Sequence, residues 1–108
     1  MNTLSTPVQT KQDIVKLLEE NQTRLEKFGV KQLGLFGSFV REEQNTQSDV
    51  DLLVEFKAGQ KTFDNFMGLS FFLEDLFQQP VELVTTDSLS PYIGPYITRE
   101  VEYVIFAT

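Results

Sequence analysis

Two aspartates separated by one residue, Asp49 and Asp51, precede the apolar run of residues 52–54, and this pair constrains the chain more than any other feature. On a strand, residues i and i+2 project from one face, roughly 6.5–7 Å apart along the chain. The two carboxylates therefore point the same way, where they repel each other and lose hydration. A divalent cation relieves both costs, and Mg²⁺ in particular binds one or two carboxylates together with waters and substrate phosphates. The pair thus indicates the chemistry of phosphoryl or nucleotidyl transfer.

A glycine-serine turn, Gly37 and Ser38, lies ten residues before the aspartates and directly follows the apolar residues 33–36. Glycine lets the backbone approach a phosphate closely. Backbone N–H groups and a serine hydroxyl at the start of a helix can hold phosphate oxygens. Each motif alone is more often an ordinary turn or a solvated strand end. An apolar run, Gly-Ser, ten residues, Asp-x-Asp and a second apolar run together form a far more specific pattern.

This pattern resembles the G-S-x(10)-D-x-D signature of the DNA polymerase β-like nucleotidyltransferase superfamily, and the similarity extends from about Leu33 to Val104. The segments LFGS and SDVDLLVEF resemble the minimal nucleotidyltransferases, and within them the MntA-type antitoxins that pair with HEPN-domain toxins. The resemblance implies a nucleotidyltransferase fold of the α/β (α+β) class. That fold is a small mixed sheet of about three strands flanked by about four helices.

For activity, the resemblance implies transfer of AMP from ATP to a hydroxyl group, typically of a tyrosine, on a cognate HEPN-domain RNase toxin. The modification would inactivate the toxin. ATP is then the substrate, and one or two Mg²⁺ ions are the cofactor. Two other functions stay open: an antitoxin that neutralises its partner by steric binding without catalysis, and an adenylyltransferase that acts on a small molecule.

The resemblance also implies roles for individual residues. Gly37 and Ser38 would hold the β and γ phosphates. Asp49 and Asp51 would bind Mg²⁺ as catalytic carboxylates, and Ser48 would belong to the nucleotide-binding residues. None of these roles needs a histidine, because metal ions and carboxylates can do the chemistry.

Arg41 and Glu82 each have two interpretations. Arg41 lies about one turn past Ser38, so its guanidinium either returns toward the phosphates or forms a surface ion pair with Glu42 or Glu43. Glu82 interrupts the apolar run of residues 81–85 and either faces solvent on an edge strand or serves as the third catalytic and metal-binding carboxylate. Many minimal nucleotidyltransferases carry V-D-L-V-T where this chain has V-E-L-V-T, which leaves the role of Glu82 open.

The composition limits the partners. A net charge of −7 argues against direct binding to nucleic acid or to an anionic membrane, and favours a basic protein or a metal-bridged nucleotide. The chain has no cysteine and no histidine, which excludes disulfides, thiolate chemistry and a histidine base. No signal peptide is apparent and no apolar run approaches the ~20 residues of a membrane span, so we expect a cytoplasmic protein.

The 108 residues are expected to form one domain, residues 1–108, with a loose tail over residues 1–9. A helix should begin at Thr10 or Asp13 and end before Gly29. The expected strands are residues 30–36, 49–56 and 81–85, and the further expected helices are residues 39–43, 63–78 and 97–106. The helix over residues 63–78 is apolar over a wide arc, which indicates burial on several sides or docking of a partner.

Overall fold

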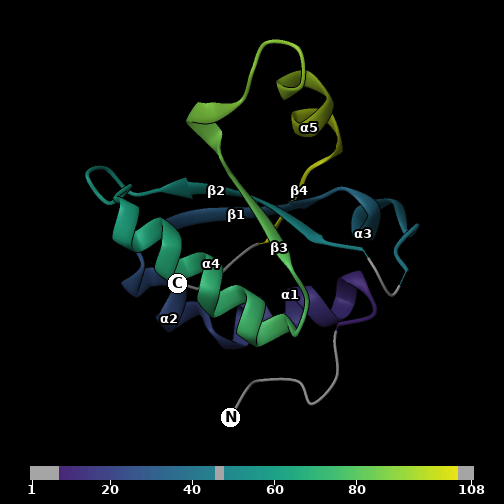
Figure 1. Ribbon diagram of the computed structural model, residues 1–108, viewed down its shortest axis with the longest axis horizontal. Coiled ribbons are helices and arrows are strands. Elements are labelled where there is room, and N and C mark those ends of the chain that lie inside the picture. Colours follow the sequence, from purple (N-terminus) through teal and green to yellow (C-terminus); the bar gives the residue numbers. More distant parts are fainter. Residues whose placement is uncertain (1–7, 46–47, 105–108) are drawn as a thin grey trace.

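The computed structural model describes residues 8–45 and 48–104, and Figure 1 shows a curved sheet with helices on both sides. The helices are α1 (Lys11–Glu20), α2 (Gln22–Lys27), α3 (Ser38–Arg41), α4 (Phe63–Phe77), the 3-10 helix η1 (Thr86–Ser88) and α5 (Gly94–Glu100). The strands are β1 (Val30–Phe36), β2 (Val50–Phe56), β3 (Val81–Thr85) and β4 (Glu102–Val104). Their order in the sheet is β3-β2-β1-β4. Strand β1 pairs antiparallel with β2 and β4, whereas β2 and β3 run parallel.

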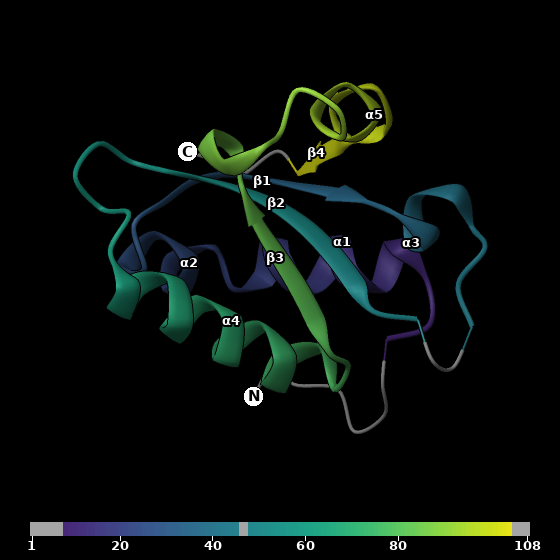
Figure 2. The ribbon, with the colours of Figure 1, turned by 45° about the horizontal axis from the view of Figure 1, so that its top comes forward.

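Helices α1, α2 and α4 cover one face of this sheet, as Figures 1 and 2 show. The apolar residues of β2 at alternate positions, Val50, Leu52 and Val54, are fully buried against these helices. The helices contribute mainly leucines, among them Leu18 of α1 and Leu73 of α4, which are also fully buried. Each such side chain stabilises the fold by roughly 1.5–3 kcal/mol on burial, so most of the folding energy lies on this face.

The opposite face carries α5 and η1 and has a much smaller core (Figure 2). Its buried residues are Phe36, Leu53 and Ile97, with Val84, Leu89 and Val101 packed against them. Because α5 covers only part of this face, polar side chains of the strands remain accessible beside it. The alternation of side chains along β2 therefore separates a packing face from a face that can carry a site.

The helix expected between Thr10 and Gly29 is two helices. Thr10 begins α1 as predicted, since its hydroxyl accepts a hydrogen bond from the Asp13 N–H and the Asp13 carboxylate accepts one from the Thr10 N–H. The helix breaks at Asn21, whose side-chain amide donates to the Leu17 carbonyl at 2.8 Å. Asparagine side chains compete in this way with the helical backbone. Gly29 then ends α2 with a φ of +82°, the predicted helix-terminating glycine.

The helix expected over residues 97–106 is wrong in its second half. Helix α5 ends at Glu100, and the next residues form the edge strand β4 against β1. The spacing of the apolar residues 97, 101 and 104, which suggested one continuous helix, reflects packing into two cores instead. Ile97 and Val101 belong to the small core, whereas Val104 belongs to the large one. As a strand, this segment also supplies hydrogen-bond partners for the second edge of β1. Residues 105 and 106 of that prediction lie outside the described residues.

The fold class is confirmed, with a fourth strand added to the expected three. The predicted loose tail is wrong at Val8, which is buried and donates its N–H to the Phe77 carbonyl at 3.0 Å; residues 1–7 lie outside the described residues. Helix α4 begins as predicted, capped by the Thr62 hydroxyl, which accepts from the Asn65 N–H. Within the described part of the chain, no helix has both the length and the hydrophobicity of a membrane-spanning segment.

Candidate functional site

Three side chains form a row across the sheet on the face that α5 covers only in part. In the strand register, Phe36 of β1 lies opposite Asp51 of β2, and Asp51 lies opposite Glu82 of β3. The parallel pairing of β2 and β3 puts the two acidic side chains next to each other on one face. Glu82 is exposed on an edge strand, which is one of the two environments expected from the sequence. It also lies next to Asp51, as the other interpretation, a third carboxylate, requires.

The carboxyl group of Asp51 is half-buried beside other acidic groups. Burial, followed by the hydrogen bond and negative charge of Glu82 and then the charge of Asp49, raises the pKa of Asp51 to about 7, and the positive charge of Arg41 opposes this rise. Adjacent carboxylates with one raised pKa are typical of sites that hold a cation or move protons. At neutral pH, Asp51 can therefore exchange its proton for another positive charge.

Gly37 brings the backbone against this carboxylate. It follows β1, where the chain turns into α3, and its φ of +81° lies in the region that favours glycine. A Cβ at this position would lie 2.0 Å from Oδ2 of Asp51. The sequence predicted a close backbone approach to a phosphate at Gly37, which stays a prediction; in the structure the group beside Gly37 is the Asp51 carboxylate.

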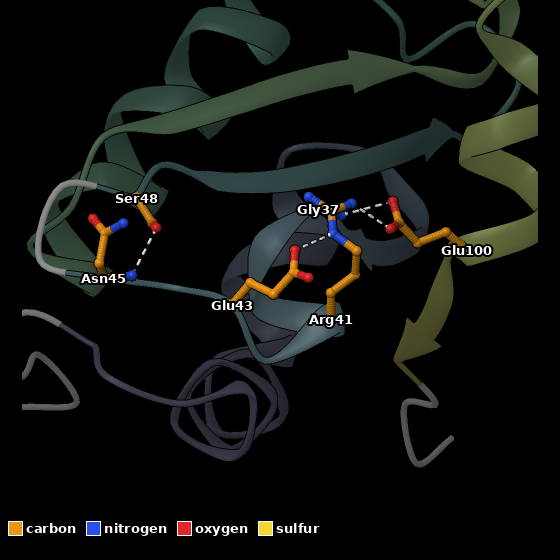
Figure 3. Close-up of polar contacts among 6 residues, drawn as sticks. All are labelled: Gly37, Arg41, Glu43, Asn45, Ser48 and Glu100. Atoms are coloured by element: carbon orange, nitrogen blue, oxygen red, sulfur yellow. Dashed lines mark hydrogen bonds and ion pairs between the residues drawn. The ribbon is translucent and has the colours of Figure 1, made fainter.

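Arg41, at the end of α3, has two acidic partners. Its Nε donates to Oε1 of Glu43 at 2.8 Å, and its Nη1 donates to Oε1 of Glu100. The ion pair with Glu43 is one of the two alternatives read from the sequence, whereas Glu42 is not a partner in the structure. Figure 3 shows Arg41 between the two glutamates, with Gly37 beside Glu100.

Glu100 is a site residue that the sequence did not indicate. Its Oε2 accepts a hydrogen bond from the Gly37 N–H at 3.0 Å. Burial alone would raise the pKa of Glu100, but the bonds from Gly37 and Arg41 outweigh burial and lower it below its ordinary value. Because 63 residues separate Gly37 from Glu100, only the position of α5 over the sheet brings them together.

These groups surround one cavity of about 360 Å³. Its polar end contains Gly37, Arg41, Asp51, Glu82 and Glu100, and its apolar end lies under α5 and η1. The apolar lining residues are Phe36, Val84, Leu89, Ile93, Tyr96 and Ile97. The exposed Tyr96 and Ile93 give the mouth of the cavity an apolar edge. A molecule with a polar end and a flat apolar end matches this division.

Three predicted site residues do not line the cavity. The Ser48 hydroxyl accepts from the Asn45 N–H at 2.8 Å, and Figure 3 shows this pair well apart from Arg41 and Gly37. Asp49 is exposed just before β2 and acts on Asp51 through its charge. Ser38 is half-buried in the first turn of α3, with its carbonyl accepting from the Glu43 N–H.

The acidic groups fit a magnesium ion only in part. Among the described residues, no group of three or more carboxylates lies close enough to hold a metal ion by itself. The adjacent Asp51 and Glu82 nevertheless suit Mg²⁺, which takes one or two carboxylates and completes its coordination with waters and substrate phosphates. The raised pKa of Asp51 shows that its ionised form is unfavourable here, and a cation at this position would stabilise that ionised form.

Known proteins resemble this chain over most of its length. Residues 14–104 match a family described as "Nucleotidyltransferase domain". The chain is 40% identical over 96 residues to the protein adenylyltransferase MntA of Thermococcus cleftensis, covering 88% of this chain and 96% of that protein. Its fold is similar to a chain in the crystal structure of a toxin-antitoxin with AMP-PNP, with a TM-score of 0.65 and 20% identity over 83% of this chain and 74% of that chain.

A second solved structure has the same fold. It contains the tri-AMPylated HEPN toxin of Shewanella oneidensis in complex with an MNT antitoxin. One of its chains matches with a TM-score of 0.60 and 19% identity, covering 86% of this chain and 73% of that chain. At this level of identity, the likeness establishes the fold.

Proposed function

Since this chain belongs to the nucleotidyltransferase domain family, we propose that it is an antitoxin that transfers AMP from ATP to a hydroxyl group of a HEPN-domain toxin. The observation that carries the proposal is the Asp51–Glu82 pair, which lies beside Gly37 and Arg41 in one cavity. Two findings support the choice of substrate and partner. The Thermococcus relative is named a protein adenylyltransferase. Structures of the same fold contain AMP-PNP in one case and an AMPylated HEPN toxin in another.

In this proposal, the triphosphate binds at the polar end of the cavity and the base at the apolar end. The Gly37 N–H and the Arg41 guanidinium donate hydrogen bonds to phosphate oxygens, and Ser38 adds its hydroxyl. The acceptor hydroxyl attacks the α-phosphorus, the bond to pyrophosphate breaks, and Glu82 accepts the hydroxyl proton. Orientation and charge neutralisation provide most of the rate enhancement in such reactions.

Asp51 and Glu82 would hold Mg²⁺, and we propose that Asp49, two residues earlier in the chain, joins them once the ion is bound. A bound magnesium ion would neutralise negative charge on the triphosphate and on the leaving pyrophosphate. Because Asp51 must give up a proton to bind it, we expect magnesium affinity to rise as pH increases through about 7.

The net charge of −7 supports a basic partner such as an RNase toxin. A tyrosine side chain is long enough to reach into an open cavity, and its hydroxyl is the acceptor we propose. AMP attached to the toxin would add bulk and negative charge at a surface that binds RNA, which inactivates the toxin. We expect the pair to act in the cytoplasm.

The test combines the protein, ATP labelled at the α-phosphate, Mg²⁺ and the proposed cognate HEPN-domain toxin. Label should appear on the toxin and map to a tyrosine by mass spectrometry. The double variant Asp49→Asn/Asp51→Asn should transfer at least a hundredfold less label. Asp75→Asn is the control, because it makes the same aspartate-to-asparagine change at an exposed position of α4 away from the cavity.

Each other outcome identifies a different function. Toxin neutralisation that survives the double substitution, with no label on the toxin, would replace the enzyme with an antitoxin that acts by steric binding. Label on a small molecule and none on the toxin would show a different acceptor. Loss of label in Asp75→Asn as well would mean that general acidity, rather than the Asp51–Glu82 pair, is required.

A further inference from the structure

The carboxylate of Glu100 accepts hydrogen bonds from two donors at the polar end of the cavity. Its Oε2 accepts from the Gly37 N–H at 3.0 Å and its Oε1 from the Arg41 guanidinium. Figure 3 shows the Glu100 side chain reaching from α5 to these two groups on the turn after β1. Each oxygen of the carboxylate thus has its own donor.

This donor set is the one that the proposed function assigns to the triphosphate. Carboxylate and phosphate oxygens accept from the same N–H and guanidinium donors, with similar distances. The Gly37 N–H has a single hydrogen, so it cannot fully serve Glu100 and a phosphate at once. Glu100 is anionic at neutral pH, as the oxygens of phosphate are, and the bonds from Gly37 and Arg41 lower its pKa further.

Charge in the cavity also opposes a nucleotide while Glu100 is in place. Of the charged residues that line the cavity in the described part of the chain, Asp51, Glu82 and Glu100 are acidic and only Arg41 is basic. The charge of Arg41 is balanced by Glu100 on one side and Glu43 on the other. A triphosphate that enters must therefore either displace Glu100 or meet its negative charge directly.

The surroundings of Glu100 allow it to leave. It is the last residue of α5, and the following residue, Val101, is already extended, with a ψ of 137°. Helix α5 is held to the sheet by the small core around Ile97 rather than by the large one. When Glu100 moves away, Glu43 still binds Arg41 and keeps its guanidinium at the turn.

We propose that Glu100 is an internal substitute for a phosphate group, which occupies Gly37 and Arg41 in the nucleotide-free protein and is displaced when a nucleoside triphosphate binds. The proposal rests on the proposed function, because it assumes that these donors bind phosphate. Its consequence is that Glu100 stabilises the empty site and weakens nucleotide binding, so that affinity for ATP is set by competition with the chain's own carboxylate.

Glu100→Gln keeps the shape of the side chain and removes its charge. We expect it to bind ATP and inorganic tripolyphosphate about tenfold more tightly than the natural protein, by isothermal titration calorimetry in the presence of Mg²⁺. Adenosine, which has no phosphate, should bind both proteins equally. The melting temperature of the nucleotide-free variant should fall, because the ion pair with Arg41 is lost.

Glu102→Gln is the matched control. Glu102 is also in an ion pair, with Lys11 at 3.0 Å, but it lies on β4 outside the cavity. This variant changes the net charge by the same amount, and its affinity for tripolyphosphate should stay within about twofold of the natural protein. Equal tightening in both variants would show a general charge effect and overturn the proposal.

If Glu100→Gln binds tripolyphosphate no more tightly, or more weakly, Glu100 does not compete with phosphate and the proposal fails. If the variant does not fold, the side-chain carboxyl carbon of Glu100 in the natural protein provides the test by NMR. Its resonance should move to that of a free glutamate when tripolyphosphate is bound, and an unchanged resonance would overturn the proposal. The proposed function fails separately, if the natural protein neither binds ATP nor transfers AMP.

Discussion

Leu52 and Leu53 are neighbours on β2 and are both fully buried, yet they lie in different environments. Leu52 packs into the large core beneath α1, α2 and α4, whereas Leu53 belongs to the small core beneath α5. The residues beside them differ in the same way. Val50 and Val54 lie on the same face as Leu52 and are apolar, while Asp51 lies on the same face as Leu53 and lines the cavity.

This difference shows how a small domain can support an unfavourable site. The face that α5 covers contains a half-buried carboxyl group with a raised pKa and a glycine with positive φ in contact with it. Ionising this carboxyl group inside the fold costs free energy. The opposite face is built from buried apolar side chains, and their packing offsets this cost.

The comparison predicts that truncation of Leu52 is the most damaging change. Leu52→Ala removes a fully buried side chain from the large core and should lower the free energy of unfolding by about 3–5 kcal/mol. Leu53→Ala, in the smaller core, should cost about 2–3 kcal/mol, because α5 can move to fill the space. Urea denaturation of the two variants measures both values. A larger loss for Leu53→Ala would reverse the assignment of the two faces.

Gly37→Ala should have the next largest effect, and it should fall on the site as well as on stability. A methyl group at this position meets the Asp51 carboxylate and strains the backbone, so we expect a loss of about 1–3 kcal/mol and no detectable ATP binding. Gly59→Ala is the control, because Gly59 also has a positive φ, +77°, but has open space where the methyl group would be placed. Equal effects on ATP binding in both variants would contradict the role of Gly37.

Asp51→Asn should stabilise the metal-free protein in a pH-dependent way. The folded protein holds a proton on Asp51 up to about pH 7, whereas the unfolded chain releases it near the ordinary value of 3.8. Stability of the natural protein therefore falls as pH rises from about 4 to about 7. The asparagine of the variant cannot ionise. At pH 8 we therefore expect the variant to be more stable than the natural protein by about 1 kcal/mol in the free energy of unfolding, which raises its melting temperature by several degrees. At pH 4 the two melting temperatures should be equal.

Asp75→Asn is again the control and should show no such pH dependence. A constant difference between Asp51→Asn and the natural protein across this pH range would mean that Asp51 ionises normally. Addition of Mg²⁺ with ATP at pH 8 should stabilise the natural protein more than Asp51→Asn, because a ligand of the folded state raises its stability.

The smallest effect is expected from Lys61→Gln. Lys61, just before α4, pairs with Asp87 of η1 at 2.7 Å and so connects the segments that cover the two faces. Its hydrogen bond, more than any other contact, lowers the pKa of Asp87. Both groups are well exposed to solvent, so the melting temperature should change by no more than about 2 °C. A larger loss would mean that this link, rather than the small core, holds η1 in place.

Local signals in the sequence predicted the central elements well. Strands β1, β2 and β3 and helix α4 follow from apolar runs and their spacing, and Thr10 and Gly29 mark helix ends through their own chemistry. The break at Asn21 was missed because one side-chain hydrogen bond overrides an apolar period that continues through it. Strand β4 was missed because Val101, just before it, and Val104, within it, pack into different cores at a spacing that also suits a helix.

The candidate site divides in the same way. The adjacency of Asp51 and Glu82 was expected from a family pattern, and the register of β2 and β3 supplies its geometry. Glu100 could not be predicted, because its contact with Gly37 depends on how α5 closes over the sheet. Ser48, Ser38 and Asp49 remain predictions, since these residues do not line the cavity.

The most direct measurement is a crystal structure of the protein with AMP-PNP and Mg²⁺. The account predicts the triphosphate in the cavity against Gly37 and Arg41, with the metal ion at Asp51 and Glu82 and the base toward Tyr96. A nucleotide bound at another surface, or a cavity still filled by its own side chains at saturating nucleotide, would contradict it.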